Sequence, residues 1–252
     1  MRFNSDQIQK IGKEISSKVD GKTLFDEFSR GRYSTDASVY QIKPLGVVLP
    51  KDTNDVLSLM EYSQKNSVPL LARGGGSSQC GQTVGESVVL DYSKHQNKIL
   101  ELNVEEKYVW VQPGVVLDHL NAYLKPHGLW FPVDVSTSSR ATIGGMSANN
   151  SCGSRSLYYG NMVHNVLAIE AILDDGSIFN FDQINKNYLA TKNNQDRLYK
   201  IIDKFIDVRK QVGGEIDANW PTTQRRVGGY NIDLIDPEGF NSSNLLVGSE
   251  GT

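Results

Sequence analysis

Two glycine-rich segments contain the residues whose types and spacing are best suited to hold a ligand. The first glycine-rich loop reads LLARGGGSSQCGQ over Leu70–Gln82, and its part Arg73–Gln79 is called the first glycine segment below. The second glycine segment reads ATIGGMSANNSCG over Ala141–Gly153. Glycine lets the backbone approach a ligand closely and adopt positive φ, and successive N–H groups in such loops form concavities that bind anions. The pair therefore predicts one polyanionic ligand that is held from two sides.

Neither of the two common phosphate-binding fingerprints fits the first glycine segment. The dinucleotide motif G-x-G-x-x-G that starts at Gly74 requires a sixth-place glycine, where the chain has Gln79. A P-loop requires lysine after its glycine, but Gly76 is followed by Ser77. The sequence thus argues against a Rossmann-type site and against an ATPase or kinase, and leaves a neutral cradle of backbone donors beside Arg73.

Composition and charge narrow the function classes. The 252 residues include 26 Lys and Arg and 29 Asp and Glu, which gives a net charge of −3 and no basic footprint for nucleic acid. No apolar run reaches the roughly 18 residues that a membrane span requires, and the first residues lack a signal-peptide core. We expect a cytoplasmic protein that binds no nucleic acid and has no transmembrane segment.

The sequence predicts no metal site. Cys80 and Cys152 both lie inside the glycine-rich loops, and no Cys/His cluster has the spacing of zinc ligands. Both cysteines are interpreted as small residues in tight spaces rather than as a redox pair.

The first glycine segment is expected to follow a strand–helix–strand unit. An apolar strand over 46–49 is followed by a helix that Asp52 or Thr53 can cap. A second strand over 68–72 then leads into Arg73, and a helical connection of this kind implies parallel strands.

The other expected elements alternate between helices and strands. The Asp175-Gly176 dipeptide predicts a tight hairpin, and residues 213–239 are rich in loop-forming residues. In chain order, the expected elements are an amphipathic helix beginning after Asn4 or Ser5 with Ile8, Ile11 and Ile15 on one face, strands with one solvated face over 88–90, 99–103 and 107–112, a helix over 116–124, hairpin strands over 168–173 and 177–181, a helix over 196–210 and a strand over 245–247.

Four motifs in a fixed order carry a resemblance to a known family. They read ARGGGSS (72–78), ATIGGMSANN (141–150), YGNMVHNVLAIEAILDDG (159–176) and GSEGT (248–252). In this order they resemble the FAD-binding domain of the vanillyl-alcohol oxidase and p-cresol methylhydroxylase superfamily. Within it, the chain is most similar to the FAD-linked D-2-hydroxy-acid dehydrogenases, which include D-lactate dehydrogenase, glycolate oxidase and D-2-hydroxyglutarate dehydrogenase.

The resemblance implies an α+β fold of two subdomains with FAD between them. It implies an N-terminal helical extension over 1–30 and an FAD-binding domain over 31–252, whose smaller subdomain covers about 40–93 and whose larger one covers about 94–252. The substrate domain of the resembled enzymes, with its catalytic base and any metal ligands, is expected after Thr252. No catalytic residue is therefore assigned, and we expect the chain by itself to be inactive.

The resemblance also implies which residues bind the cofactor. The first glycine segment would wrap the pyrophosphate through backbone donors, and the second would complete that cradle near the flavin. Ile169 would offer backbone hydrogen bonds to adenine, and Glu250 would lie near the flavin. In full, the expected cofactor-binding residues are Arg73, Gly74, Gly75, Gly76, Ser77, Ser78, Gln79, Asp134, Ser136, Thr137, Thr142, Gly144, Gly145, Asn149, Gly153, Ser154, Ile169 and Glu250.

The chain departs from the family pattern at informative places. Members that attach flavin covalently often carry histidine where this chain has Ser77, so we expect non-covalent FAD. The usual Asp-Pro is Asp134-Val135 here, and the usual Asp-His appears as His164-Asn165. A flavin-proximal role for His164 and a substrate-carboxylate role for Arg226 are hypotheses that the residue types allow.

The implied activity is oxidation of a D-2-hydroxy acid by hydride transfer to FAD. Two alternatives stay open: another FAD enzyme on this scaffold, of the UDP-N-acetylenolpyruvoylglucosamine reductase type, and a flavin-binding module without turnover. The stretch 32–50 is similar to the entry of larger members that contain an iron–sulphur region, which implies an electron-acceptor protein or a quinone as a partner. Peripheral attachment of a full-length protein to a membrane also stays open.

Overall fold

The computed structural model describes residues 3–191 and 196–251, and the chain divides into two compact units. Unit 1 comprises residues 1–131, 136–145 and 174–176, and unit 2 comprises residues 132–135, 146–173 and 177–252. Unit 1 thus extends beyond the smaller subdomain expected at about 40–93, and the assignment of the subdomains stays a prediction. Thr252, the last residue of the fourth motif, lies outside the described residues.

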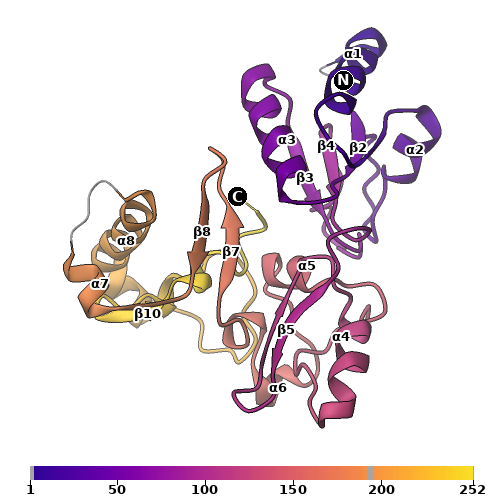
Figure 1. The fold of residues 1–252 in the computed structure, drawn as a ribbon. Coiled ribbons are helices and arrows are strands. Elements are labelled where there is room, and N and C mark those ends of the chain that lie inside the picture. The colour runs from indigo at the N-terminus through magenta and orange to yellow at the C-terminus, as the bar shows by residue number, and fades with distance from the viewer. Residues whose placement is uncertain (1–2, 192–195, 252) are drawn as a thin grey trace. The chain divides into compact units, whose positions relative to one another are not determined.

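Unit 1 contains a four-stranded sheet in the order β1-β2-β4-β3 (Figure 1). Its strands are β1 (Lys22–Leu24), β2 (Gly46–Leu49), β3 (Leu70–Arg73) and β4 (Val88–Asp91). β2 and β3 both run parallel to β4, which lies between them, whereas β1 runs antiparallel to β2. The parallel unit is confirmed.

Two details of this sheet differ from the sequence-based expectation. β4 was expected to have one solvated face, but all four of its residues are buried, as is typical of strands in parallel sheets that are covered on both faces. β1 lies within residues 1–30, where only helix was expected, and its short sequence KTL has no alternation that could indicate a strand.

The helices of the first part of unit 1 begin where the sequence predicts. α1 (Ser5–Ser16) is capped by Asn4, and its Ile8, Ile11 and Ile15 are buried. α3 (Thr53–Asn66) connects β2 to β3 and is capped by the Asp52 carboxylate. A further short helix, α2, covers Glu27–Arg32.

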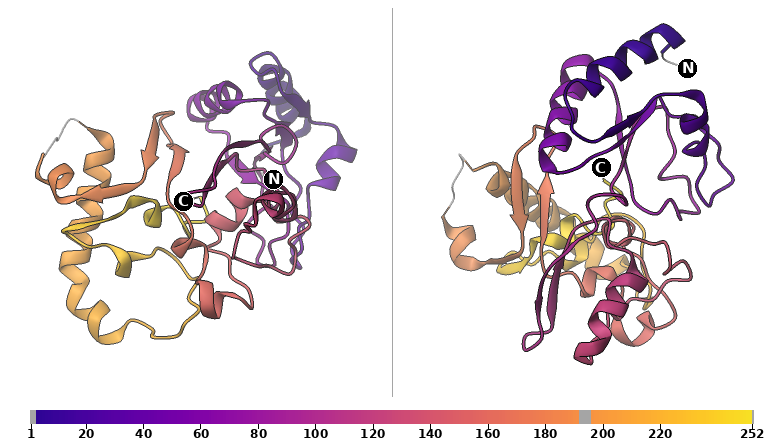
Figure 2. Two further views of the ribbon diagram at one scale, coloured as in Figure 1. Left: turned by 60° about the horizontal axis from the view of Figure 1, so that its bottom comes forward. Right: turned by 45° about the vertical axis from the view of Figure 1, so that its right-hand side comes forward.

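The second part of unit 1 is a hairpin with a helix beside it. β5 (Ile99–Asn103) and β6 (Tyr108–Val111) pair antiparallel, and α4 (Leu117–Leu124) lies beside them, as the right view of Figure 2 shows. Leu120 and Leu124 are buried and pack with Ile99 and Val109 from the hairpin. The 3-10 turn η1 (Lys125–His127) follows α4.

Unit 2 has its own apolar core. The predicted hairpin forms from β7 (Ile169–Ile172) and β8 (Ile178–Phe181) around a turn in which Gly176 has φ of 83°. The apolar core cluster of unit 2 includes Phe181, Ile202 and Phe240. The remaining elements outside unit 1's sheet and hairpin are α5 (Ile143–Ala148), α6 (Ser156–Tyr159), η2 (Met162–His164), β9 (Gln183–Asn185), α7 (Lys186–Ala190), α8 (Arg197–Asn219), η3 (Ile232–Leu234), β10 (Gly239–Asn241) and η4 (Ser242–Leu245).

Two expectations for unit 2 were wrong in part. α8 was expected to end near residue 210, but it continues to Asn219, with Ile216 buried and Arg209 bound to Asp217 at 3.0 Å. The strand expected over 245–247 is instead the end of η4 and the turn after it, because the N–H groups of Leu246 and Val247 donate back to the carbonyl of Ser243 at 2.9 and 3.0 Å. Asn231 also donates to the carbonyl of Val247 at 2.7 Å.

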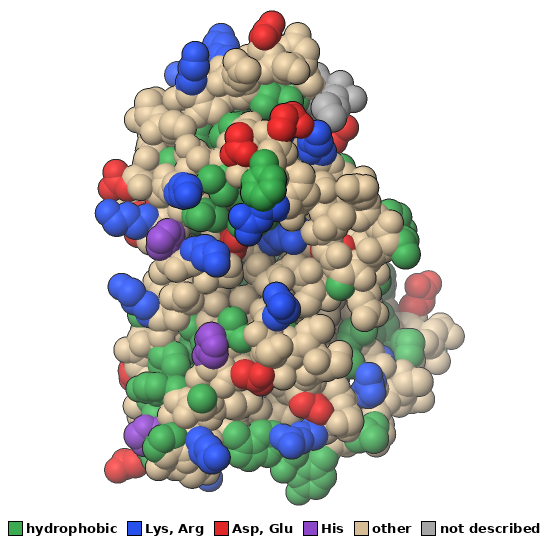
Figure 3. Space-filling model, turned by 90° about the vertical axis from the view of Figure 1, so that its right-hand side faces the viewer, with side chains coloured by type: hydrophobic (Ala, Val, Ile, Leu, Met, Phe, Trp, Pro, Cys, Tyr) green, Lys and Arg blue, Asp and Glu red, His purple; other side chains and the backbone are tan. Residues whose placement is uncertain are grey.

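Charged side chains of both signs are interspersed on the face drawn in Figure 3. Among the described residues, no helix combines the length and the apolar character that crossing a membrane requires.

Candidate cofactor site

The first glycine segment leaves the sheet of unit 1 at the carboxyl end of β3. Arg73 is the last residue of this strand and pairs in register with Asp91 of β4. In open sheets with parallel strands, ligands bind beyond the carboxyl ends of the strands. The segment therefore lies where a sheet of this kind offers a binding site.

Each of the three glycines of this segment occupies a position that disfavours a side chain. A Cβ on Gly74 would lie closer than 3.0 Å to the hydroxyl of Thr142, and a Cβ on Gly75 would lie equally close to the carbonyl oxygen of Arg140. Gly76 has φ of 63°, which strains other residues. The structure thus brings the first glycine segment into direct contact with residues 140–142, at the start of the second.

The backbone donors of the first glycine segment are available. Among the described residues, the N–H groups from Gly74 to Gln79 donate to no protein acceptor. The segment is half-buried to exposed, so these donors can reach a ligand. Six successive unpaired N–H groups with close-packed glycines fit a pyrophosphate, which accepts several hydrogen bonds at once.

The residues of unit 1 around the start of the second glycine segment hydrogen-bond to other protein groups. The N–H of Gly144 donates to the carbonyl of Pro113 at 2.9 Å, and a Cβ on Gly144 would approach Pro113 closer than 3.0 Å. Gly145 donates to the Thr142 hydroxyl at 3.4 Å. The carbonyl of Thr137 accepts from the N–H groups of residues 140 and 141 at 2.8 Å, while Ser136 is exposed. These residues shape the loop that contacts Gly74 and Gly75.

Asp134, Gly153 and Ser154 come together in unit 2. The Asp134 carboxylate accepts from the Ser154 hydroxyl at 2.7 Å and from the N–H of Arg155 at 2.9 Å, and a Cβ on Gly153 would lie closer than 3.0 Å to the Asp134 carbonyl. Burial opposes ionisation of Asp134, but the hydrogen bonds from Ser154 and Arg155 outweigh it and lower its pKa. The carboxylate therefore fixes the turn at 153–155.

The fourth motif packs against the second glycine segment within unit 2. The N–H groups of Gly248 and Glu250 donate to the carbonyls of Ser147 and Ala148 at 3.0 and 2.9 Å. Gly248 also lies against Asn150, whose buried side chain accepts from the N–H of Val163 at 3.0 Å. Two motifs a hundred residues apart are thereby joined.

Asn149 and Ile169 occupy more open positions in the same unit. Asn149 donates to the Ser151 hydroxyl at 3.0 Å. Ile169 begins β7, whose sheet has β8 as its only other strand among the described residues. One edge of β7 is therefore not paired in that sheet. A backbone contact from Ile169 to adenine would require such an unpaired edge.

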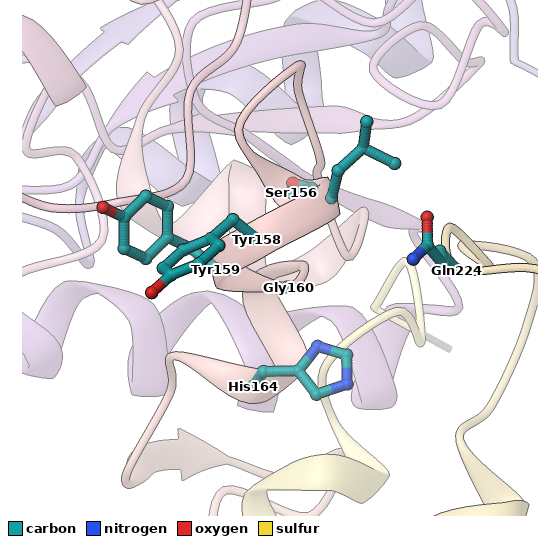
Figure 4. Close-up of a pocket in the computed structure, with 7 residues that line it drawn as sticks. Ser156, Tyr158, Tyr159, Gly160, His164 and Gln224 are labelled. Carbon is teal, nitrogen blue, oxygen red and sulfur yellow. The ribbon is translucent and has the colours of Figure 1, made fainter.

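His164 lines a shallow hollow of about 340 Å³ with α6, Gly160 and Gln224. Its Nδ1 accepts from the N–H of Asn161 at 3.0 Å. Figure 4 shows the rings of Tyr158 and Tyr159 pointing away from His164 and Gln224. The polar groups that line the hollow do not converge on one point, as they would in a ligand site. The flavin-proximal role of His164 therefore stays a hypothesis.

Arg226 is already engaged inside unit 2. Its guanidinium binds Asp233 at 2.6 Å and lies 5.5 Å from the centre of the Trp220 ring. A substrate carboxylate would have to compete with Asp233, which weakens the hypothesis that Arg226 binds substrate.

The sequence analysis missed the segment 33–36 as part of this site. The carbonyls of Tyr33 and Thr35 accept hydrogen bonds from Arg73, and Asp36 accepts from Thr83 at 3.0 Å. Its residues belong to the stretch 32–50 that the resemblance singled out, but backbone acceptors leave no signal in residue types.

The fold agrees with that of solved structures. A Physcomitrella patens BBE-like 1 variant aligns with a TM-score of 0.60 at 20% identity, over 74% of this chain and 39% of that chain. The α+β fold of the p-cresol methylhydroxylase type is confirmed. The family model for the FAD binding domain matches residues 44–182, and the chain belongs to this family.

Curated relatives extend the likeness to most of the chain. D-2-hydroxyglutarate dehydrogenase of Haemophilus influenzae is 35% identical over 232 residues, which cover 87% of this chain and 22% of that protein. Glycolate oxidase subunit GlcD of Bacillus subtilis is 37% identical over 176 residues, which cover 68% of this chain and 37% of that protein. The chain thus spans between about a fifth and two fifths of the length of these relatives.

Proposed function

We propose that this chain is the cofactor-binding part of an FAD-dependent dehydrogenase that oxidises a D-2-hydroxy acid. The observation that carries the proposal is the run of unpaired N–H groups from Gly74 to Gln79, pressed against residues 140–142 by glycines that leave no room for a Cβ. The family match supports FAD as the ligand of this cradle. The names of the relatives, both of which act on 2-hydroxy acids, support the substrate class.

In this proposal the first glycine segment binds the pyrophosphate through its backbone. Thr142, Gly144 and Gly145 hold the facing loop at the distance that the segment requires. Asp134, Gly153 and Ser154 fix a second turn, and Ile169 offers its backbone to adenine. Bound FAD would supply the acceptor for a hydride from the substrate.

Attachment of the FAD is proposed to be non-covalent. Ser77 stands directly after Gly76, where covalently flavinylated members of the superfamily often have histidine. A serine hydroxyl at this place can donate to a phosphate but is not the family's flavin-linking group. The electron acceptor, whether an iron–sulphur region, another protein or a quinone, and the cytoplasmic location stay predictions.

The test begins with the chain as it is. When FAD is titrated into the purified chain, its fluorescence is expected to be quenched until one equivalent has been added. Acid precipitation of the protein is then expected to leave the flavin in the supernatant. A chain that never takes up FAD would contradict the cofactor assignment, and flavin that precipitates with the protein would contradict non-covalent binding.

The substrate class is tested in a protein of the relatives' length that contains this chain. Anaerobic addition of D-2-hydroxyglutarate, D-lactate or glycolate is expected to bleach the flavin absorbance. If FAD binds but no 2-hydroxy acid bleaches it, the flavin-binding module without turnover is the better description.

A further inference from the structure

The side chain of Arg73 is turned into the protein rather than toward the open donors of the first glycine segment. Nη1 donates to the carbonyls of Tyr33 and Thr83 at 3.3 and 3.1 Å, and Nη2 donates to the carbonyl of Thr35 at 2.8 Å. Arginine presents five N–H donors in a planar fork. Three of its hydrogen bonds therefore reach three backbone positions that come from two separate segments.

A second layer of contacts holds the guanidinium in place. Its Cζ lies 5.2 Å from the centre of the Tyr33 ring, and the Tyr33 hydroxyl donates to the buried carboxylate of Asp91 at 2.6 Å. Asp91 also accepts from the N–H of Ser93 at 2.8 Å. Burial, reinforced by Asp91, raises the pKa of Tyr33, so its hydroxyl stays a proton donor at neutral pH.

The partners of Arg73 enclose the glycine segment. Arg73 begins the loop and Thr83 ends it, so one side chain joins both ends of residues 73–83. The hydroxyl of Thr83 donates to Asp36 at 3.0 Å, and Tyr40 lies against Gly81, where φ is 81°. A Cβ on Gly76 would lie closer than 3.0 Å to Nη2 of Arg73, so the loop folds directly over the guanidinium.

We propose that Arg73 is a positioning residue that pins residues 73–83 to the segment 33–36 and thereby sets the backbone N–H groups of Gly74–Gln79 for the FAD pyrophosphate. This inference rests on the proposed function for the identity of the ligand. The positive charge of Arg73 is not sufficient for this role. Lysine has the same charge, but it has no planar fork and cannot bind the three carbonyls in this geometry.

The alternative is that Arg73 attracts the pyrophosphate as a positive charge. The two roles differ in what Arg73→Lys does, because lysine keeps the charge and loses the fork. We therefore compare Arg73→Lys with Arg73→Met, in which both are lost. Tyr33→Phe and Thr83→Val are further variants, because each removes one hydroxyl of the second layer and keeps the carbonyl that Arg73 binds.

The first readout is amide hydrogen exchange of the chain without FAD. Faster exchange is expected over 73–83 in Arg73→Lys and Arg73→Met, with no change in the β5–β6 hairpin. Smaller increases in the exchange rate over 73–83 are expected in Tyr33→Phe and Thr83→Val. These two variants keep the test valid if the arginine variants fail to fold. Unchanged exchange over 73–83 in the folded variants would overturn the proposal, whether or not the chain binds FAD.

The second readout is FAD binding. Both arginine variants are expected to lose about tenfold or more in affinity, with the dependence on salt unchanged, and the ³¹P resonances of FAD bound at saturation are expected to shift in Arg73→Lys. Wild-type affinity in Arg73→Lys together with a loss in Arg73→Met would show that the charge matters. A wild-type chain that binds no FAD would contradict the proposed function, while the exchange readout would still decide the role of Arg73.

Discussion

Gly75 lies against the backbone of Arg140 so closely that a Cβ on residue 75 would come within 3.0 Å of the carbonyl oxygen. A backbone oxygen cannot rotate away as a side chain could, so one of the two loops must move. Gly75→Ala is expected to weaken FAD binding about tenfold or more and to lower the free energy of unfolding by about 1–3 kcal/mol.

Gly85 provides the matched control for this substitution. Its Cβ would meet Leu71 and Ser87 at 3.5 and 3.6 Å, which is ordinary contact. Gly85→Ala is expected to stay within about 0.5 kcal/mol of wild type. Fluorescence titration and denaturant unfolding check both variants, and wild-type FAD affinity in Gly75→Ala would contradict the close approach.

Gly74 meets a side chain instead of a backbone atom, and this difference can be measured. A Cβ on Gly74 would be too close to the Thr142 hydroxyl, but it would lie 3.3 Å from the Thr142 Cβ. Gly74→Ala is therefore expected to weaken FAD binding, and adding Thr142→Ala is expected to restore part of the loss. Thr142→Ala alone should cost about 1–2 kcal/mol, since it removes a hydrogen bond from Gly145 at 3.4 Å and one buried methyl group. If the two effects simply add in a double-mutant cycle, the contact is not the cause.

Asp134 makes the turn at 153–155 sensitive to acid. Its pKa in the folded chain lies below the ordinary value of 3.8, so its contribution to stability is complete above that value and is lost as the pH falls through the folded-state pKa. The protection of the Arg155 amide, measured as its exchange rate relative to the intrinsic rate at the same pH, is expected to fall below about pH 4. In Asp134→Asn this loss of protection should disappear, because the group no longer titrates; a loss of protection that persists would locate the titration elsewhere.

Asp55 holds the start of α3 to the turn before β1. Its buried carboxylate accepts from the N–H groups of Asp20, Gly21 and Lys51 at 2.7, 2.9 and 2.7 Å. Asp55→Ala leaves these donors without their acceptor and is expected to lower the free energy of unfolding by about 2–3 kcal/mol. The control is Asp20→Ala, whose exposed side chain makes one ion pair at 3.8 Å and should matter by less than about 1 kcal/mol. Equal effects in denaturant unfolding would contradict the role of Asp55.

Much of the local structure could be predicted because it depends on local chemistry. Asn4 and Asp52 cap the helices that they were expected to cap, and the Asp175-Gly176 turn forms its hairpin. Each of these elements is determined by residues within a few positions of each other. The family motifs indicated the fold, and the glycines of the first segment marked the place where the chain packs closely, most clearly at Gly75, which faces a backbone oxygen.

What could not be predicted depends on partners far away in the sequence. β2 and β3 pair along the two edges of β4, and the burial of both its faces depends on other parts of unit 1 that cover the sheet. The turn after η4 depends on Asn231, and the role of Arg73 depends on carbonyls at 33 and 35. Residue type says nothing about which distant carbonyl a donor will find.

The hydrogen bonds that join Gly248 and Glu250 to Ser147 and Ala148 also set the order in which the chain can fold. Closing so long a loop costs conformational entropy before any contact returns it, and such non-local pairing slows folding. During synthesis the second glycine segment leaves the ribosome long before its partners do. The carbonyls at 147 and 148 can therefore gain these two partners only after Glu250 has emerged.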